Sequence, residues 1–365
     1  MSVLIFIIIL GALVFVHELG HFLFAKWSKM RVDEFAIGFP PKLFSFKRGE
    51  TTYALNLIPF GGYVKIFGEN PDDTSGNPEA SNSFVNKTKW QQALVLVAGV
   101  LFNVLFAWIL FTIGFLSGFP TIVNEENRNA VSDPRVMITN IAPESPALEG
   151  GLLLGDVIKE IDTETSDPFM VTSVEGVQAF ITAHQDESLD FTVLRNQGKE
   201  TTTVTVDTKE GIVEGKKAVG IMMGLIGEMR LGFFNAVWQG AVTTVDKTKE
   251  VAVGLGTFLG QIFTGNAKFD QVAGPVGIVG LVGDASEIGF IFLLSFTAVI
   301  SLNLAVLNLI PFPALDGGRL LFILIETIIR KPIPHKIANT INAVGFIVLI
   351  GLMIVITISD VIKLF

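Results

Sequence analysis

Residues 2–27 decide the fold, and they read SVLIFIIILGALVFVHELGHFLFAKW. The stretch is longer than the about 20 apolar residues that a helix needs to cross a bilayer. His17, Glu18 and His21 interrupt it, and ionisable side chains at such depth are costly and mark functional sites. The stretch has neither a basic start nor an A-x-A-like cleavage site, so we expect a transmembrane helix and not a cleavable signal peptide.

Three further stretches have the same character, at about 92–118, 288–310 and 338–362. Half of the 365 residues are hydrophobic and only 17% are charged, whereas ordinary globular domains carry about 25% charged residues. The sequence therefore predicts a polytopic α-helical membrane protein with four transmembrane helices.

The charges outside these helices are unevenly distributed. The net charge of −9 argues against a nucleic-acid partner, because nucleic acids select basic surfaces. Basic residues outnumber acidic ones nine to seven in 26–91 and four to two in 311–336, whereas 119–287 has twelve basic and twenty-four acidic residues. Basic loops mark the cytoplasmic side. We expect a multi-pass protein of the plasma (inner) membrane, with both termini and 119–287 extracytoplasmic.

The segment 119–229 is expected to form one inserted extracytoplasmic α+β domain, with its core at 134–222. Alternation predicts a strand at 135–141 and a hairpin over 189–206, and helical spacing predicts a helix at 174–183. The order of these elements resembles a PDZ domain, through the run Ala147–Ile161. Such a domain binds extended chains by strand addition; the alternative is a structural cap on the membrane region.

Two other segments are expected to lie at the membrane. Residues 28–91 contain strand-like sequence, with alternation over 52–57, and a loop at 70–83. A β-hairpin there can enter the membrane only if it lines a protein cavity, and 52–57 could offer a strand edge to a substrate. An amphipathic helix over 230–264 is interrupted by charges, which predicts an interfacial region at 230–287 and not a fifth span.

The motif His17-Glu-Leu-Gly-His21 carries the chemistry. On a helix, positions i and i+4 share a face, so both imidazoles can bind one metal ion. Glu18 follows His17 directly and lies on the neighbouring part of the helix surface. It can therefore act on a metal-activated water as general base without being a ligand. The alternatives are a polar cluster that packs helices together and a histidine pair for haem.

Catalytic zinc usually has three protein ligands, so a third is needed. The chain has no cysteine and four histidines, which favours a carboxylate. Asp316 is the best candidate because it follows the third helix in NLIPFPALDGG (308–318), where two prolines break the helix and Gly317 and Gly318 permit a bend. The alternative is that Asp316 caps the helix that follows it.

These motifs together resemble the site-2 protease family of intramembrane zinc metalloproteases. HELGH lies in the first helix, Asn-x-x-Pro-x-Pro-x-Leu-Asp-Gly follows the third, and a PDZ-like insert separates the second from the third. The chain is similar to the bacterial regulator-of-sigma-E protease branch through Gly61–Lys65 and Ala273–Val279. It differs in having room for one PDZ domain, where that branch often has two, and in Ile37-Gly-Phe-Pro-Pro41, where the family has Gly-Phe-Gly-Pro.

The resemblance implies that His17, His21 and Asp316 bind Zn²⁺ and that Glu18 is the catalytic base. It also implies that asparagines near the end of the third helix hold the substrate, at Asn303 and Asn308; the alternative is a helix–helix hydrogen bond.

Four other polar or small residues are expected to have no catalytic role. Asn103 and Gly99 in the second helix are interpreted as packing residues, and His184 and His335 as ordinary surface residues.

The working hypothesis is an intramembrane zinc metalloendopeptidase that cleaves single-span transmembrane substrates within or beside the lipid bilayer. Its role would be regulated intramembrane proteolysis, such as releasing membrane-tethered anti-sigma factors or clearing signal-peptide remnants. The rival is a metal-independent scaffold or chaperone that binds extended segments through the PDZ domain and tolerates substitution of His17. A transporter would need inverted repeats or paired broken helices, and the sequence has one such break, at 311–318.

The predicted organisation therefore has eight parts. They are transmembrane helix 1 (1–27), the cytoplasmic or membrane-associated strand region and loop (28–91), transmembrane helix 2 (92–118), the PDZ-like domain (119–229), the interfacial amphipathic region (230–287), transmembrane helix 3 (288–310), the cytoplasmic loop with the Leu-Asp-Gly motif (311–337) and transmembrane helix 4 (338–362).

Overall fold

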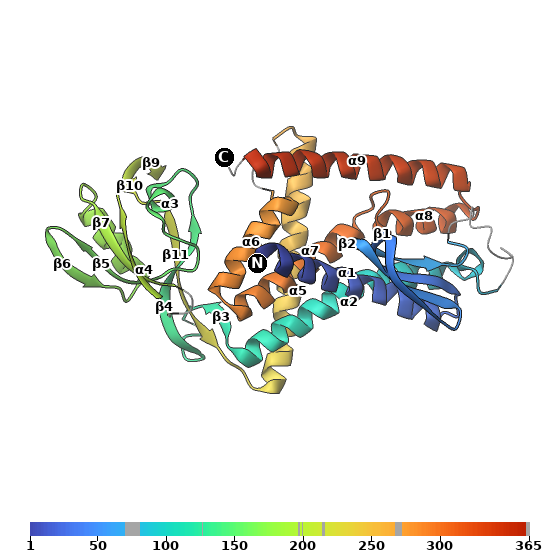
Figure 1. Ribbon diagram of the computed structural model, residues 1–365, viewed down its shortest axis with the longest axis horizontal. Coiled ribbons are helices and arrows are strands. Elements are labelled where there is room, and N and C mark those ends of the chain that lie inside the picture. The colour runs from blue at the N-terminus through green and yellow to red at the C-terminus, as the bar shows by residue number, and fades with distance from the viewer. Residues whose placement is uncertain are drawn as a thin grey trace. The chain divides into compact units, whose positions relative to one another are not determined.

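The computed structural model describes residues 1–69, 81–125, 127–195, 198, 200–213, 216–266 and 272–362, and Figure 1 shows the course of the chain. Most of the loop expected at 70–83 lies outside these residues. The chain forms two compact units. Unit 1 comprises 1–110, 240–283 and 296–365, and unit 2 comprises 111–239 and 284–295.

Within the described residues, four helices are long and apolar enough to cross a membrane. They are α1 (Ser2–Trp27), α2 (Lys89–Ser117), α7 (Phe290–Leu309) and α9 (His335–Ile362). Their ends lie within three residues of those expected from the sequence. Most apolar side chains of α9 are exposed, Ile347 to 69%, which suits a surface that faces lipid. The structure thus agrees with a multi-pass membrane protein.

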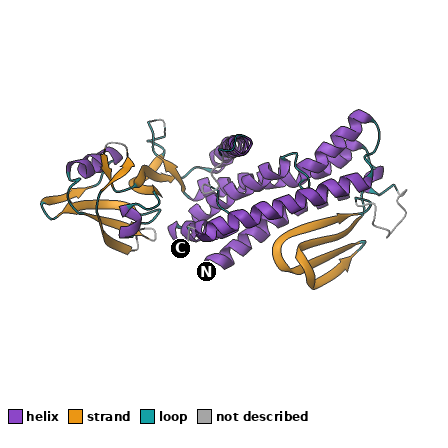
Figure 2. Cartoon of the chain, turned by 90° about the horizontal axis from the view of Figure 1, so that it is seen from above, coloured by secondary structure: helices purple, strands orange, loops and turns teal. Residues whose placement is uncertain are grey.

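A curled antiparallel sheet packs against α1 in unit 1 (Figure 2). Its two long strands are β1 (Val32–Arg48) and β2 (Thr51–Ile66). The first part of β1 pairs on one side with the end of β2, as Ala36 with Tyr63, and on the other with its beginning, as Ala36 with Ala54. The second part of β1 pairs with the beginning of β2, as Ser45 with Ala54. The strand segments therefore lie in the order 42–48, 51–56, 32–37, 62–66.

This register corrects one expectation. The segment at 52–57 was expected to offer a free edge, but it is paired on both sides over 52–55. The segments with one paired side, among the described residues, are 42–48 and 62–66. Alternation along one stretch of sequence cannot reveal this, because an edge is defined by which distant strand pairs beside it.

Helix α5 (Phe233–Phe263) is long and amphipathic but is not among the four candidate spans. Within unit 1, its residues 240–263 run across the direction of α1 and α9 and not alongside them (Figure 1). The interfacial location of this helix stays a prediction. The next helix, α6 (Pro275–Ile288), begins where Gly277 N donates a hydrogen bond of 2.8 Å to the buried carboxylate of Asp360 in α9.

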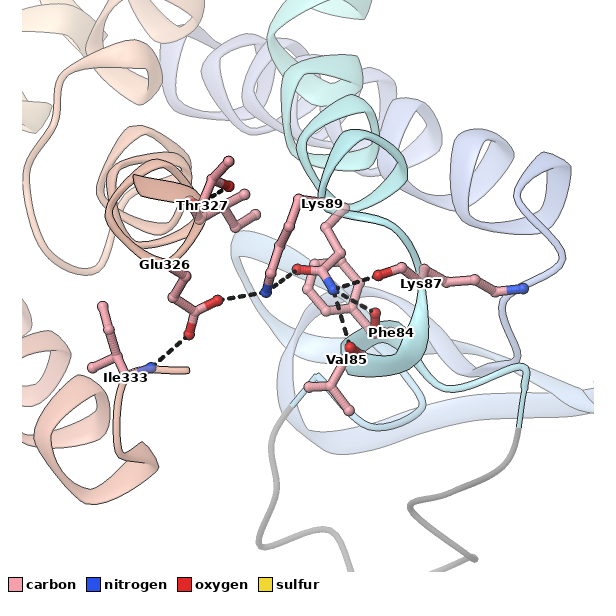
Figure 3. Close-up of polar contacts among 9 residues, drawn as sticks. Phe84, Val85, Lys87, Lys89, Glu326, Thr327 and Ile333 are labelled. Atoms are coloured by element: carbon pink, nitrogen blue, oxygen red, sulfur yellow. Dashed lines mark hydrogen bonds and ion pairs between the residues drawn. The ribbon is translucent and has the colours of Figure 1, made fainter. Parts of the chain in front are cut away.

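Helix α8 (Asp316–Ile329) is tied to the beginning of α2 by polar contacts (Figure 3). Lys89 Nζ lies 2.5 Å from Glu326 Oε2, and the other oxygen of Glu326 accepts a bond of 2.9 Å from Ile333 N. Gln92 donates to three carbonyls in or next to the short 3-10 helix η1 (Phe84–Asn86). These contacts hold the end of α8 that lies farthest from Asp316.

Unit 2 contains a mixed α+β domain. Its strands are β3 (Phe119–Ile122), β4 (Val131–Ile141), β5 (Val157–Thr163), β6 (Ser166–Met170), β7 (Leu189–Arg195), β8 (Glu200–Val206), β9 (Lys209–Val213), β10 (Lys216–Ala218) and β11 (Ile221–Met229), and its helices are α3 (Pro146–Gly150) and α4 (Val174–Ala183). The main sheet has the order β3-β11-β4-β5-β7-β8, with β6 beside β5 and a separate β9–β10 hairpin.

The predicted helix at 174–183 coincides with α4, and the predicted hairpin is β7–β8. Strand β11 was not expected, although it pairs with both β3 and β4 and extends the sheet to Met229. The core is apolar, with Ile161, Val177 and Phe191 fully buried. Asp156 is also buried, and Arg195 binds its two oxygens at 2.8 and 2.9 Å.

Candidate metal centre

The HELGH motif lies on α1 with both histidines buried, each 8% exposed. His17 and His21 are one turn apart, so their rings lie on the same face, with centroids 4.7 Å apart. Glu18 is half-buried and points to a neighbouring part of the helix surface, where β2 approaches. A Cβ on Gly62 of β2 would lie 3.2 Å from Glu18 Cγ, so the strand passes directly beside this side chain.

Helices α1 and α2 approach each other closely at this level. A Cβ on Gly20 would collide with the backbone of Ala98 in α2. A Cβ on Gly99 would lie 2.5 Å from His21 Nε2 and 2.8 Å from His17 Cε1. The two glycines therefore leave the space in which the rings lie, as small residues do where membrane helices pack tightly.

Helix α2 also provides the hydrogen-bond partners of both rings. His21 Nδ1 lies 2.8 Å from the Val95 carbonyl oxygen, and His17 Nδ1 lies 3.2 Å from the Asn103 amide. Gly99 thus has the packing role expected of it, whereas Asn103 has in addition a polar contact with His17 that the sequence interpretation did not include. An asparagine inside an apolar span could have indicated this.

Asp316 reaches the histidines through a tight turn between α7 and α8. The turn includes Ala314, which has a positive φ of 76° and donates its N–H to Asn342 of α9. Gly317 and Gly318 were expected to bend the chain, but both lie inside α8 and neither has a positive φ. They are needed for close approach, because a Cβ on either would collide with the backbone of this turn.

The alternative role of Asp316 as a helix cap is wrong. Leu315 is the N-cap residue of α8, Asp316 is the first residue of the helix, and no side chain makes a capping hydrogen bond. The Asp316 side chain is instead directed to α1, where its Oδ2 lies 3.1 Å from His17 Nε2 and 3.3 Å from His21 Nε2.

These three atoms form a triangle that fits a metal ion. The two Nε2 atoms are 3.1 Å apart, so all edges are between 3.1 and 3.3 Å. Ligand atoms of a tetrahedral zinc ion, bound at about 2.0–2.2 Å, are about 3.3–3.6 Å apart. Asp316 Oδ2 is also buried without a hydrogen-bond partner among the described residues, as expected of an atom that faces a cation. Three such ligands leave a fourth position open.

An ion pair near Asp316 links α8 to the sheet. One turn along α8, Arg319 pairs with Glu69, which follows β2. This ion pair connects the helix that carries Asp316 to the sheet that borders Glu18.

The other predicted residues lie elsewhere. Asn303 is exposed on α7 and its amide donates to Val299 O of the same helix, at 2.9 Å, so this bond lies within α7 and is not the helix–helix bond considered as the alternative. Asn308 is half-buried and lies seven residues after Ser301, on the face of α7 that contacts α2. His184 is half-buried at the end of α4, and His335 begins α9.

A family model extends over almost the whole of this architecture. The model of peptidase family M50 matches residues 5–352. The chain belongs to peptidase family M50. The site-2 protease resemblance inferred from the motifs is thereby confirmed, and this M50 member is a zinc metalloprotease with Zn²⁺ as its cofactor.

Relatives of this M50 peptidase match it from end to end. Zinc metalloprotease RasP of Geobacillus kaustophilus is 33% identical, over 100% of this chain and 98% of the relative. Zinc metalloprotease RasP of Bacillus licheniformis is 31% identical and the regulator of sigma-W protease RasP of Bacillus subtilis 30%, each over 100% of this chain and 99% of the relative. A metal-independent scaffold finds no support in these relatives.

Proposed function

We propose that this M50 peptidase cleaves single-span transmembrane proteins within or beside the bilayer, with His17, His21 and Asp316 as zinc ligands and Glu18 as general base. The observation that carries the proposal is the triangle of Nε2, Nε2 and Oδ2 atoms, with edges of 3.1–3.3 Å, built on an apolar helix that is long enough to span a membrane. A soluble substrate would have no access to such a position in lipid.

Each side chain has a distinct part in the reaction. When bound, zinc polarises the scissile carbonyl and activates the attacking water. Glu18 projects beside the ligands without belonging to the triangle, so it can take the proton of that water and deliver it to the leaving amine. Asp316 brings a negative charge to the site, which balances part of the charge of the cation.

The sheet next to α1 provides a place for an extended substrate. A transmembrane helix has its backbone groups paired internally, so a substrate must unwind locally before hydrolysis. The segment 62–64 has one unpaired edge among the described residues, and its Gly62 lies against Glu18. A substrate strand that pairs with this edge would pass beside the catalytic base. Asn308, and Asn303 on the exposed face of α7, would bind backbone groups released by unwinding.

The α+β domain of unit 2 is proposed to be PDZ-like and to receive extended segments. Strand β11 pairs with β3 only from Ile226 onward, so 221–224 keeps one edge free among the described residues, and α4 packs beside it. Such an edge next to a helix suits strand addition. With basic loops in the cytoplasm, this domain and both termini face outward in the plasma membrane.

The name of a relative supports a substrate class. Bacillus subtilis RasP carries the name regulator of sigma-W protease. By similarity, the present chain would act on membrane-tethered regulators such as anti-sigma factors, or on signal-peptide remnants.

The test uses the purified full-length protein and a model single-span substrate. Glu18→Gln should bind zinc as the wild type does and leave the substrate intact, because only the proton acceptor is lost. Glu326→Gln is the matched control: it is also a partly buried glutamate of unit 1, but it lies at the far end of α8 and should not affect cleavage. Undiminished cleavage by Glu18→Gln would refute the role of the base. Full zinc retention by Asp316→Ala would refute the ligand set.

A further inference from the structure

One face of α2 contacts the two histidines of HELGH with three different chemical groups. Val95, Gly99 and Asn103 follow one another at intervals of four residues, so they are aligned along the helix. The Val95 carbonyl oxygen is hydrogen-bonded to His21, and the Asn103 amide contacts His17. Gly99 has no side chain and so leaves space for both rings. Both ring nitrogens contacted by α2 are Nδ1, which leaves both Nε2 atoms to Asp316.

A metal ligand requires a ring nitrogen without a proton. Because Nε2 of His17 belongs to the ligand triangle, the proton of the neutral ring must be on Nδ1. His21 meets the same requirement by donating Nδ1–H to the Val95 carbonyl, at 2.8 Å. The partner of His17 Nδ1–H must likewise be an acceptor, and the side-chain amide of Asn103 is the group within reach, at 3.2 Å.

The amide of Asn103 can supply that acceptor. The residue is fully buried, and its Oδ1 has no hydrogen-bond partner among the described residues when the amide nitrogen faces His17. An asparagine amide keeps its shape when oxygen and nitrogen exchange places. With Oδ1 towards His17, the oxygen accepts Nδ1–H, and Nε2 keeps its lone pair for the metal ion.

We propose that Asn103 is a positioning residue that holds His17 in its Nδ1–H tautomer and orients Nε2 towards the zinc ion. This inference rests on the proposed ligand set. Residues that accept the second N–H of a metal-bound histidine typically raise metal affinity by about 10–100-fold. Asn103 would thus act on the reaction through His17, without touching the substrate.

The packing role of Asn103 can be separated from this role. Ser301 of α7 donates its hydroxyl to the backbone carbonyl of Asn103, at 2.8 Å. That bond connects α2 to α7 and does not involve the amide side chain. Ser301→Ala therefore removes the interhelical bond at the same residue but leaves the contact with His17 intact.

The experiment measures zinc affinity of the full-length protein by competition with a chelator, and the absorption spectrum of the Co²⁺-loaded protein. Asn103→Leu, which is similar in volume and cannot accept a hydrogen bond, should lower zinc affinity by about 10–100-fold and alter the Co²⁺ spectrum. Asn103→Asp keeps an acceptor oxygen and should restore both to within about threefold of the wild type, since carboxylates are common partners of metal-bound histidines. Ser301→Ala should match the wild type.

Unchanged zinc affinity and an unchanged Co²⁺ spectrum in Asn103→Leu would overturn the proposal, and so would equal losses in Asn103→Leu and Ser301→Ala. If Asn103→Leu does not fold, ¹⁵N NMR of the zinc-loaded wild type tests the protonation of His17 Nδ1 directly. The chain has only four histidines, so few imidazole resonances need to be distinguished. The proposal requires the His17 resonance to report a protonated Nδ1, and a proton-free Nδ1 overturns it. Failure of the wild type to bind zinc, or full binding by His17→Ala, would instead overturn the ligand set.

Discussion

Replacing Gly99 by alanine tests whether the approach of α2 sets the metal centre. A methyl group at this position would lie 2.5 Å from His21 Nε2, 2.6 Å from His21 Cε1 and 2.8 Å from His17 Cε1. Ordinary van der Waals contact begins at 3.4 Å, so the nearest atom must retreat by 0.9 Å. That atom is one of the three that form the ligand triangle.

The displacement is large compared with what a metal site tolerates. Ligand distances in metal sites are held to within about 0.2 Å, and the required shift is more than four times that. His21 cannot take up the shift freely, because its Nδ1 is hydrogen-bonded at 2.8 Å to the carbonyl of Val95, which lies on α2 like Gly99. We expect Gly99→Ala to lower zinc affinity at least about 100-fold, or about 2.8 kcal/mol, and to lower peptidase activity in proportion at limiting zinc.

The assay is zinc competition with a chelator, run beside a matched helix variant. Gly11→Ala lies on α1, where a Cβ would meet no atom within 4 Å. Both substitutions favour a helix by about 0.5–1 kcal/mol, so a loss of zinc in Gly99→Ala alone cannot come from weaker helix formation. Zinc affinity within threefold of the wild type in Gly99→Ala would refute the reasoning.

Three further predictions concern stability. Arg195→Leu should destabilise the α+β domain by about 3–5 kcal/mol, because it leaves a buried carboxylate unpaired. Arg135→Leu removes an exposed ion pair and should cost less than about 1 kcal/mol. Hydrogen exchange of the sheet amides distinguishes the two variants. Asp360→Leu removes the acceptor of Gly277 N and should speed amide exchange at the start of α6 by about tenfold, and Asp360→Asn should restore slow exchange. Glu326→Ala should lower the melting temperature slightly and leave zinc affinity unchanged, since a partly exposed pair contributes little.

Much of the metal centre could be predicted because its signals are local. The four-residue spacing of His17 and His21 places both rings on one face of any helix, and their surroundings show that the helix is apolar. The prolines before Asp316 end a helix wherever they occur. Helical periodicity likewise placed α4 correctly, because burying a regular stripe of apolar residues needs no knowledge of the partner.

What could not be predicted depends on which distant segments become neighbours. Asn103 and Gly99 look like packing residues in an apolar helix until α2 is placed against α1, so their contacts with His17 and His21 were missed. A free sheet edge was expected at 52–57, whereas the outer segments of the sheet are 42–48 and 62–66, because β1 pairs with β2 twice. No local pattern determines how a long strand folds back on its partner.

The sequence by itself predicted a membrane-embedded chain, a ligand set of histidine and carboxylate, and HELGH as the centre of that set. Composition, the lack of cysteine and helical spacing are properties of the chain alone, so they need no three-dimensional knowledge. Only the tertiary structure decided that Asp316 Oδ2 completes a triangle with edges of 3.1–3.3 Å, and that α2 contacts the other nitrogen of each ring. The reason is physical: metal coordination depends on shifts of about 0.2 Å, and packing between helices remote in sequence sets positions at that scale.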